Sequence, residues 1–316
     1  MTTDSPTDRR AVAAGATGMA LVGSSVVVSG LLIDAPLFTA QAARYALAAL
    51  LLLAIGRAAG RPAVRPRGRE WLWLAGVAVS GLVVFNIAVV RGVEHAEPAV
   101  IAVAVACAPV FLGVLGPLAQ RHRPAGPVLA AAVVVTAGCA LVEGAGRSDA
   151  AGLGWAAVAL ACECGFTLFA LPVLGRHGAL GVSLHAVWLG AAMFAVLGLV
   201  VEGPAAVAEL TAQQWAASAW LAVAVTAVAF VLWYAAVGRL GPGPAGLLTG
   251  IAPVSAALGG AVLGRSLPGP VVWLGISVVI GGLAIGLRAG RMRRPHPGLA
   301  DQSRADGPDM PDRTRL

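Results

Sequence analysis

The sequence contains little charge and no lysine. Only 12% of its 316 residues are Asp, Glu, Lys or Arg, about half of the share found in a soluble domain. Its residues are 58% hydrophobic and form continuous runs of about twenty, long enough for a helix to cross ~30 Å of hydrocarbon. Because these runs are continuous rather than alternating, they do not fit a transmembrane β-barrel. The composition therefore predicts an all-α integral membrane protein.

Sequence signatures of ATP-driven transporters and of common membrane enzymes are also missing. There is no phosphate-binding Gly loop ending in Lys-Ser/Thr, no HExxH, no Gly-x-Ser-x-Gly and no pair of aspartates inside a span. The four cysteines all fall in apolar runs, so we expect neither a metal site nor a disulfide at Cys107, Cys139, Cys162 and Cys164. We expect no cofactor and no enzymatic activity.

The arginines indicate how the chain is oriented in the membrane. The formal net charge is +7, and all 22 basic residues are Arg. In a membrane protein such residues set orientation, so they do not indicate a nucleic-acid partner. With the N-terminus inside, 18 arginines fall on the inner side, three on the outer side and one, Arg44, within a span. This split predicts ten spans with both termini in the cytoplasm, over residues 11–32, 36–56, 71–91, 97–119, 125–143, 152–174, 179–201, 213–236, 242–263 and 269–288.

The ten spans divide into two halves that share one plan. Pro98 and Pro109 are 11 residues apart, as are Pro242 and Pro253, and the second prolines of the two pairs are 144 residues apart. Because each half has an odd number of spans, we expect the halves to be inverted relative to each other. These prolines are candidate hinges. The predicted organisation is a cytoplasmic tail (1–10), a first five-helix repeat (11–143), a linker (144–151), a second five-helix repeat (152–288) and a disordered cytoplasmic tail (289–316).

Two charged residues are expected at membrane depth. Arg44 lies roughly 12 Å from the outer end of its span, and Glu163 lies roughly 16 Å from the outer end of its own span, at 1.5 Å per residue. Charges inside a bilayer are costly and usually mark a pathway or a site. We therefore expect both to face one cavity and to pair across the halves. Two alternatives remain open: Arg44 reaches the interface with its long side chain, or Glu163 is a protonated packing residue.

Uncharged polar side chains occur at similar depths. We expect a substrate path lined by Ser24, Ser25, Gln41, Asn86 and Thr226. Asn86 is the strongest of these candidates, because a buried amide needs several partners, whereas Ser and Thr often bond their own helix. His185, nearer the inner side, is either a second proton-coupling group or a hydrogen-bonded structural residue.

Small residues recur at helical spacing near the end of the chain. Gly260 and Gly264, and Gly282 and Gly286, form small-xxx-small pairs. Such pairs let helix backbones approach closely. They serve either packing within the bundle or a homodimer surface.

Three local patterns occur in order along the chain. The first span contains Val22-Gly23-Ser24-Ser25, and the second contains Ala43-Arg44-Tyr45-Ala46-Leu47. The fourth and fifth spans, like the ninth and tenth, carry a Pro, an apolar run and then a Gly-rich run. In this order the patterns resemble the EamA family of the drug/metabolite transporter superfamily, over about residues 11–288. The resemblance implies export of amino acids, related metabolites or drugs across the inner membrane, through a cavity between the halves.

The chain also departs from that family's patterns. Val22 stands where the family commonly has Trp, and Gln120-Arg121 and Gly264-Arg265 stand where it has Gly-Glu. Glu163 is not a position associated with the family. These departures leave the expected fold intact but prevent transfer of any one relative's substrate.

The sequence therefore predicts a secondary active transporter in the cell membrane, an exporter of a small polar metabolite such as an amino acid or a drug-like compound. Arg44 would bind a substrate carboxylate or hold Glu163, and Glu163 is the first candidate for proton coupling. Two other functions remain open: a membrane enzyme acting on a lipid-linked substrate, and a non-transporting membrane scaffold.

Overall fold

The structure is a computed structural model that describes residues 6–61, 63–262 and 267–292. Residues 1–5, Gly264, Arg265 and the tail from residue 293 lie outside the described part. The described residues form helices and no strand, with one isolated β-bridge between Ala96 and Ser148. The all-helical prediction is therefore confirmed.

The helices of the first half of the chain are interrupted at several points. They are α1 (Pro6–Ser29), α2 (Leu37–Ala58), α3 (Glu70–Ala78), α4 (Phe85–Val93), α5 (Pro98–Val105), α6 (Ala108–Ala119) and α7 (Gly126–Glu143). A short 3₁₀ helix, η1 (Gly30–Leu32), ends α1, and a π-helical segment, η2 (Val79–Val84), joins α3 to α4.

The second half has the same kinds of interruption. Its helices are α8 (Ala150–Leu168), α9 (Leu171–Val201), α10 (Ala206–Glu209), α11 (Ala212–Trp220), α12 (Ala229–Leu240), α13 (Pro242–Leu247), α14 (Ile251–Val262) and α15 (Pro270–Met292). A π-helical segment, η3 (Leu221–Val228), joins α11 to α12, and a 3₁₀ helix, η4 (Leu248–Gly250), joins α13 to α14.

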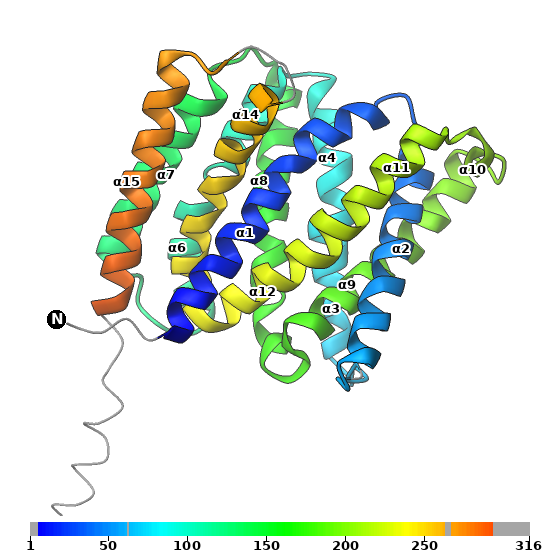
Figure 1. Ribbon diagram of the computed structural model, residues 1–316, viewed down its shortest axis with the longest axis horizontal. Helices are drawn as coiled ribbons and strands as arrows, with labels where there is room; N and C mark the ends of the chain where they lie inside the picture. Colours follow the sequence, from blue (N-terminus) through cyan, green and yellow to red (C-terminus); the bar gives the residue numbers. More distant parts are fainter. Residues whose placement is uncertain (1–5, 62, 263–266, 293–316) are drawn as a thin grey trace, which may run out of the picture.

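Nine helical segments of the described chain are long and apolar enough to cross a membrane, which makes this a multi-pass membrane protein. Ten were expected. The expected first span is the 24-residue helix α1, which is not among the nine. Figure 1 shows α1 crossing the front of the bundle between α12 and α14, and both helices contact it. The start of α1 and the end of α15 lie at the same end of the bundle (Figure 1).

The four candidate hinge prolines lie at helix starts and just after breaks. Pro98 begins α5 and Pro242 begins α13. Pro109 follows the turn between α5 and α6, and Pro253 follows η4. Because proline lacks an N–H, it fits the first turn of a helix better than the middle. Their role as hinges stays a prediction.

The helices α7 and α15 touch through glycines. A Cβ added at Gly138 would lie 2.8 Å from the backbone nitrogen of Val279, and one at Gly275 would lie 2.7 Å from the carbonyl oxygen of Gly138. At Gly282 it would lie 2.8 Å from a methyl group of Val135. Only glycine permits backbones to approach this closely.

The second small-residue pair also packs inside the chain. A Cβ at Gly286 would lie 2.4 Å from Leu247 and 2.7 Å from Ala131. Together with the contact of Gly282 on α7, this confirms the expectation of packing within the bundle for Gly282 and Gly286.

Gly178 makes the turn that precedes the expected span 179–201. Gly178 has φ 65° and ψ 174°, within the helical stretch Leu171–Val201, so the chain changes direction there without a longer loop. This backbone conformation is essentially restricted to glycine, and other residues adopt it at a cost of about 1–3 kcal/mol.

We predict that Gly178→Ala lowers the free energy of unfolding by about 1–3 kcal/mol, because alanine is strained at this φ. The matched control is Gly175→Ala, an exposed helical position three residues earlier where an added Cβ meets nothing within 4 Å. Alanine there should be neutral or stabilising. Thermal unfolding of both variants in detergent measures the difference, and equal melting temperatures would contradict the strain argument.

Candidate functional site

Arg44 lies on α2, buried between the first and second halves of the chain. Arg44 is 9% exposed. Its Nε donates a hydrogen bond of 2.9 Å to the hydroxyl of Thr226 in η3, and its Nη1 donates one of 3.4 Å to Oε1 of Gln41. The guanidinium carbon lies 5.1 Å from the centroid of the Tyr45 ring. All of these partners are uncharged, so the cation is solvated by the protein but not neutralised.

Asn86 on α4 holds Gln41 in place. Its Oδ1 accepts a 2.8 Å hydrogen bond from Nε2 of Gln41. Its Nδ2 donates to the carbonyl oxygen of Leu82 at 2.6 Å and to the Tyr45 hydroxyl at 3.2 Å. This network fixes the orientation of both amides, so that Gln41 presents its carbonyl oxygen to Arg44. The structure thus brings together four of the predicted site residues: Gln41, Arg44, Asn86 and Thr226.

This network connects Arg44 to both π-helical segments. Thr226 belongs to η3 in the second half, and Leu82 belongs to η2 in the first half. A π-helical segment changes the register of backbone hydrogen bonds and often lies at a functional position. Arg44 is therefore bonded directly to η3 and, through Gln41 and Asn86, to η2.

Glu163 does not pair with Arg44. It lies on α8, half-buried between the buried residues Cys162 and Cys164. Within the described residues its carboxyl group makes no hydrogen bond or ion pair, and Arg44 donates its hydrogen bonds to Thr226 and Gln41. The expected pair is therefore not formed in this conformation.

Ser24 is engaged away from the Arg44 network. Its hydroxyl donates to the carbonyl oxygen of Leu21 at 2.6 Å and accepts from Nε1 of Trp220 at 3.4 Å. Ser25, its neighbour, is half-buried and makes no hydrogen bond to another described side chain. The structure does not bring these two serines into hydrogen-bond contact with Arg44.

Both ring nitrogens of His185 have partners. Its Nδ1 lies 3.1 Å from Nε1 of Trp188, which can only donate, so Nδ1 accepts. Its Nε2 therefore carries the proton and donates to the carbonyl oxygen of Val64 at 2.9 Å. Protonating Nδ1 would break the bond from Trp188, so this geometry fits the structural alternative for His185.

Two carboxylates that were not among the predicted site residues join α2 and the start of α3 to α9. Glu202, just after α9, accepts hydrogen bonds from the backbone N–H groups of Phe38 and Thr39, both at 2.8 Å, and from the Thr39 hydroxyl at 2.7 Å. It thereby caps α2, whose own N-cap residue, Pro36, makes no side-chain cap. In the sequence, the only sign of this contact was that α2 has no capping side chain of its own at Pro36.

Glu70 makes the corresponding contact at the other end of α9. It binds Nη1 of Arg176 and lies 3.2 Å from Nε2 of His177. The carbonyl oxygen of Arg65 accepts a further bond of 3.3 Å from Nη2 of Arg176. The helix α9 is thus bonded to α2 near one end, and to α3 and the preceding loop near the other.

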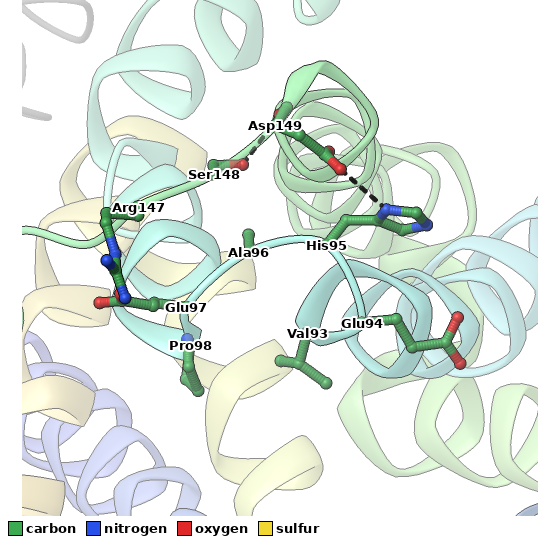
Figure 2. A pocket seen from close by; sticks show the side chains of 9 residues that line it. All are labelled: Val93, Glu94, His95, Ala96, Glu97, Pro98, Arg147, Ser148 and Asp149. Carbon is green, nitrogen blue, oxygen red and sulfur yellow. Dashed lines mark hydrogen bonds and ion pairs between the residues drawn. The ribbon is translucent and has the colours of Figure 1, made fainter.

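A shallow surface depression that shares no residue with the Arg44 network lies where the α4–α5 turn meets the linker before α8 (Figure 2). Asp149 lies 3.0 Å from Nδ1 of His95, and Arg147 lies 3.0 Å from Glu97. The backbone N–H of Gly152 and the His95 ring lower the pKa of Asp149. Figure 2 shows these side chains facing one another across the two loops, so they hold the linker in place. No group of three His, Cys, Asp or Glu side chains suited to a metal ion occurs in the described residues.

Comparison with known proteins agrees with a transport role for this bundle. Residues 9–144 match the EamA-like transporter family. The chain is 27% identical over 280 residues to an uncharacterized transporter, YetK, of Bacillus subtilis, covering 85% of this chain and 84% of that protein. It is 29% identical over 192 residues to a protein of Streptantibioticus cattleyicolor named as a probable terminal-alkyne amino-acid exporter, covering 60% of this chain and 64% of that one.

A solved crystal structure shares the fold. It superimposes with a TM-score of 0.77 at 21% sequence identity, covering 90% of this chain and 99% of the other. The likeness extends over both halves of the chain, although the family match covers the first. Through residues 9–144, the chain is similar to the EamA-like transporter family.

Proposed function

We propose that this EamA-type transporter is a secondary active exporter of a small metabolite that carries a carboxylate, such as an amino acid. It works by alternating access between two inverted five-span halves, 11–143 and 152–288, with both termini on the cytoplasmic side of the cell membrane. The observation that carries the proposal is the buried Arg44 guanidinium, which bridges the halves and has only uncharged partners.

Similar interruptions and contacts in the two halves support the inverted arrangement. The π-helical segments begin at Val79 and Leu221, an offset close to the 144 residues that separate Pro109 from Pro253. The packing between the halves is also reciprocal. The first helix of the first half, α1, contacts α12 and α14 of the second half, and the first helix of the second half, α8, contacts α4 and α5 of the first. Reciprocal packing of this kind is expected of inverted repeats.

Arg44 supplies the anchor for the substrate carboxylate. An isolated charge in a low-dielectric region is costly, and hydrogen bonds from neutral groups offset that cost only in part. A carboxylate arriving at the guanidinium would form charge-assisted bonds, which are about twice as strong as neutral ones. Gln41, Asn86 and Thr226 hold the guanidinium in place, while Ser24 and Ser25 are candidate lining residues further along the path.

Glu163 supplies the proton-coupling carboxyl group. It lies in a span, and no cation or hydrogen-bond donor among the described residues fixes its charged form. Such a group can bind a proton in one conformation and release it in another. We assign coupling to Glu163 rather than to His185, because both ring nitrogens of His185 are already bonded.

We predict that Arg44→Gln lowers kcat/KM for carboxylate-bearing amino acids by about 30-fold or more, since truncating one side of a buried charge pair costs about 2–5 kcal/mol. The measurement is uptake of radiolabelled amino acids into reconstituted vesicles, with the corresponding amines, which lack the carboxylate, as comparison substrates. Arg91→Gln, at an exposed arginine paired with Glu94, is the matched control. Wild-type transport by the Arg44 variant would remove this residue from the mechanism.

We further predict that Glu163→Gln uncouples transport from a pH gradient but leaves exchange of substrate for substrate intact, because glutamine cannot carry a proton across. Accumulation of labelled amino acid is measured with and without an imposed gradient, and exchange is measured at equal pH. Glu209→Gln, at an exposed carboxylate, serves as the control. Gradient-driven accumulation at the wild-type level in the Glu163 variant would assign coupling elsewhere.

A further inference from the structure

Five arginines lie within 13 residues where α2 connects to α3. We call Arg57, Arg61, Arg65, Arg67 and Arg69 the arginine loop. All five are exposed, and none of their guanidinium groups has an ion-pair partner among the described residues. The carboxylate that follows them, Glu70, is already bound by Arg176 and His177. The arginine loop therefore carries uncompensated positive charge.

Backbone hydrogen bonds fix the described parts of this loop on both sides of residue 62. The N–H of Arg61 donates to the carbonyl oxygen of Gly56 at 2.8 Å. The N–H of Arg67 donates to the Glu70 carboxylate at 2.8 Å. The carbonyl oxygens of Val64 and Arg65 accept bonds from α9, so the second half of the chain also fixes the loop. The guanidinium groups are thus presented by a pre-arranged backbone, which lowers the entropy cost of binding a ligand.

Exposed aromatic side chains place the loop at the level of lipid headgroups. Trp71 and Trp73 directly follow it at the start of α3, and each is 39% exposed. Trp188 on α9, in edge contact with Trp71 at 6.0 Å, is 37% exposed. Exposed tryptophans near the ends of membrane-spanning helices lie at the membrane–water interface. The α2–α3 connection also lies at the same end of the bundle as the start of α1 (Figure 1).

From the exposed charge, the fixed backbone and the tryptophans, we propose that the arginine loop is a binding site for the phosphate headgroups of anionic phospholipids. Arginine binds phosphate oxygens through two parallel N–H groups, and each basic residue near an anionic membrane surface contributes about 1 kcal/mol. Because Arg65 and Val64 also bond α9, a lipid bound here stabilises the contact between α2, its following loop and α9. This inference is independent of the transported substrate.

Positive residues on the inner side of a membrane protein already have a role in orientation during insertion. That role ends once the chain is folded, and it does not depend on which phospholipid surrounds the folded protein. A headgroup site instead predicts that anionic lipid stabilises the folded protein by binding it. The two explanations therefore differ in a measurement on purified protein.

The experiment titrates purified full-length protein in maltoside micelles with phosphatidylglycerol or with phosphatidylcholine and follows thermal unfolding by tryptophan fluorescence. Phosphatidylglycerol should raise the melting temperature more than phosphatidylcholine does. Removing two charges in Arg65→Gln/Arg67→Gln should raise the half-saturating phosphatidylglycerol concentration roughly 30-fold, at about 1 kcal/mol per arginine. The matched control is Arg121→Gln/Arg123→Gln, two exposed arginines with the same spacing, and it should shift by less than about threefold on the same scale.

Several outcomes would overturn the proposal. These are equal stabilisation by both lipids, equal loss of affinity in the test and control variants, or stabilisation by inorganic phosphate equal to that by phosphatidylglycerol, which would indicate a bare anion site. If the double variant does not fold, the proposal is tested on the wild-type protein through the salt dependence of its lipid preference. Its preference for phosphatidylglycerol must shrink as salt is raised from 0.1 to 1 M, where the Debye length falls from about 10 to 3 Å, and an unchanged preference would refute the proposal. A negative result here leaves the proposed transport function untouched.

Discussion

The structure depends on keeping a guanidinium group buried without a counter-charge. Arg44 is stabilised there by oxygen atoms of Thr226 and Gln41 and by the Tyr45 ring, which come from both halves of the chain. These weak partners are effective only when their positions are exact to a fraction of an ångström, because hydrogen bonds fall off steeply with distance and angle. The helix that carries Arg44 is accordingly capped at one end by Glu202, and the chain that follows its other end is bonded to α9 through Val64 and His185.

Much of the fold was predictable from composition and spacing. Continuous apolar runs predicted the helices. The repeated prolines were predicted as hinges, and the second of each pair, Pro109 and Pro253, lies just after a break in its span. Gln41, Arg44, Asn86 and Thr226 were among the seven polar residues predicted to line one path, because polar side chains are rare at membrane depth. The expected first span, α1, is present as a helix but is not among the nine membrane-crossing helices of the described residues.

The details of the site were not predictable for two physical reasons. Counting residues along a span gives the depth of a side chain but not its direction around the helix axis, so equal depths did not bring Arg44 and Glu163 into contact. Contacts between segments distant in sequence also leave no local pattern. The bonds of Glu202 to Phe38 and Thr39 span more than 160 residues, and the bond of His185 to Val64 spans 121 residues.

The glycine contacts between α7 and α15 limit how the two halves of the chain can move. At Gly138 on α7 and Gly275 on α15 no side chain separates the two backbones, so the backbone atoms of the two helices are in direct contact. Sliding one helix along the other would push Val135 or Val279 into a peptide group, and packed interiors resist such compression. These contacts therefore resist sliding of α7 along α15, whereas α2 and α9, at the opposite side of the bundle (Figure 1), are not held by them.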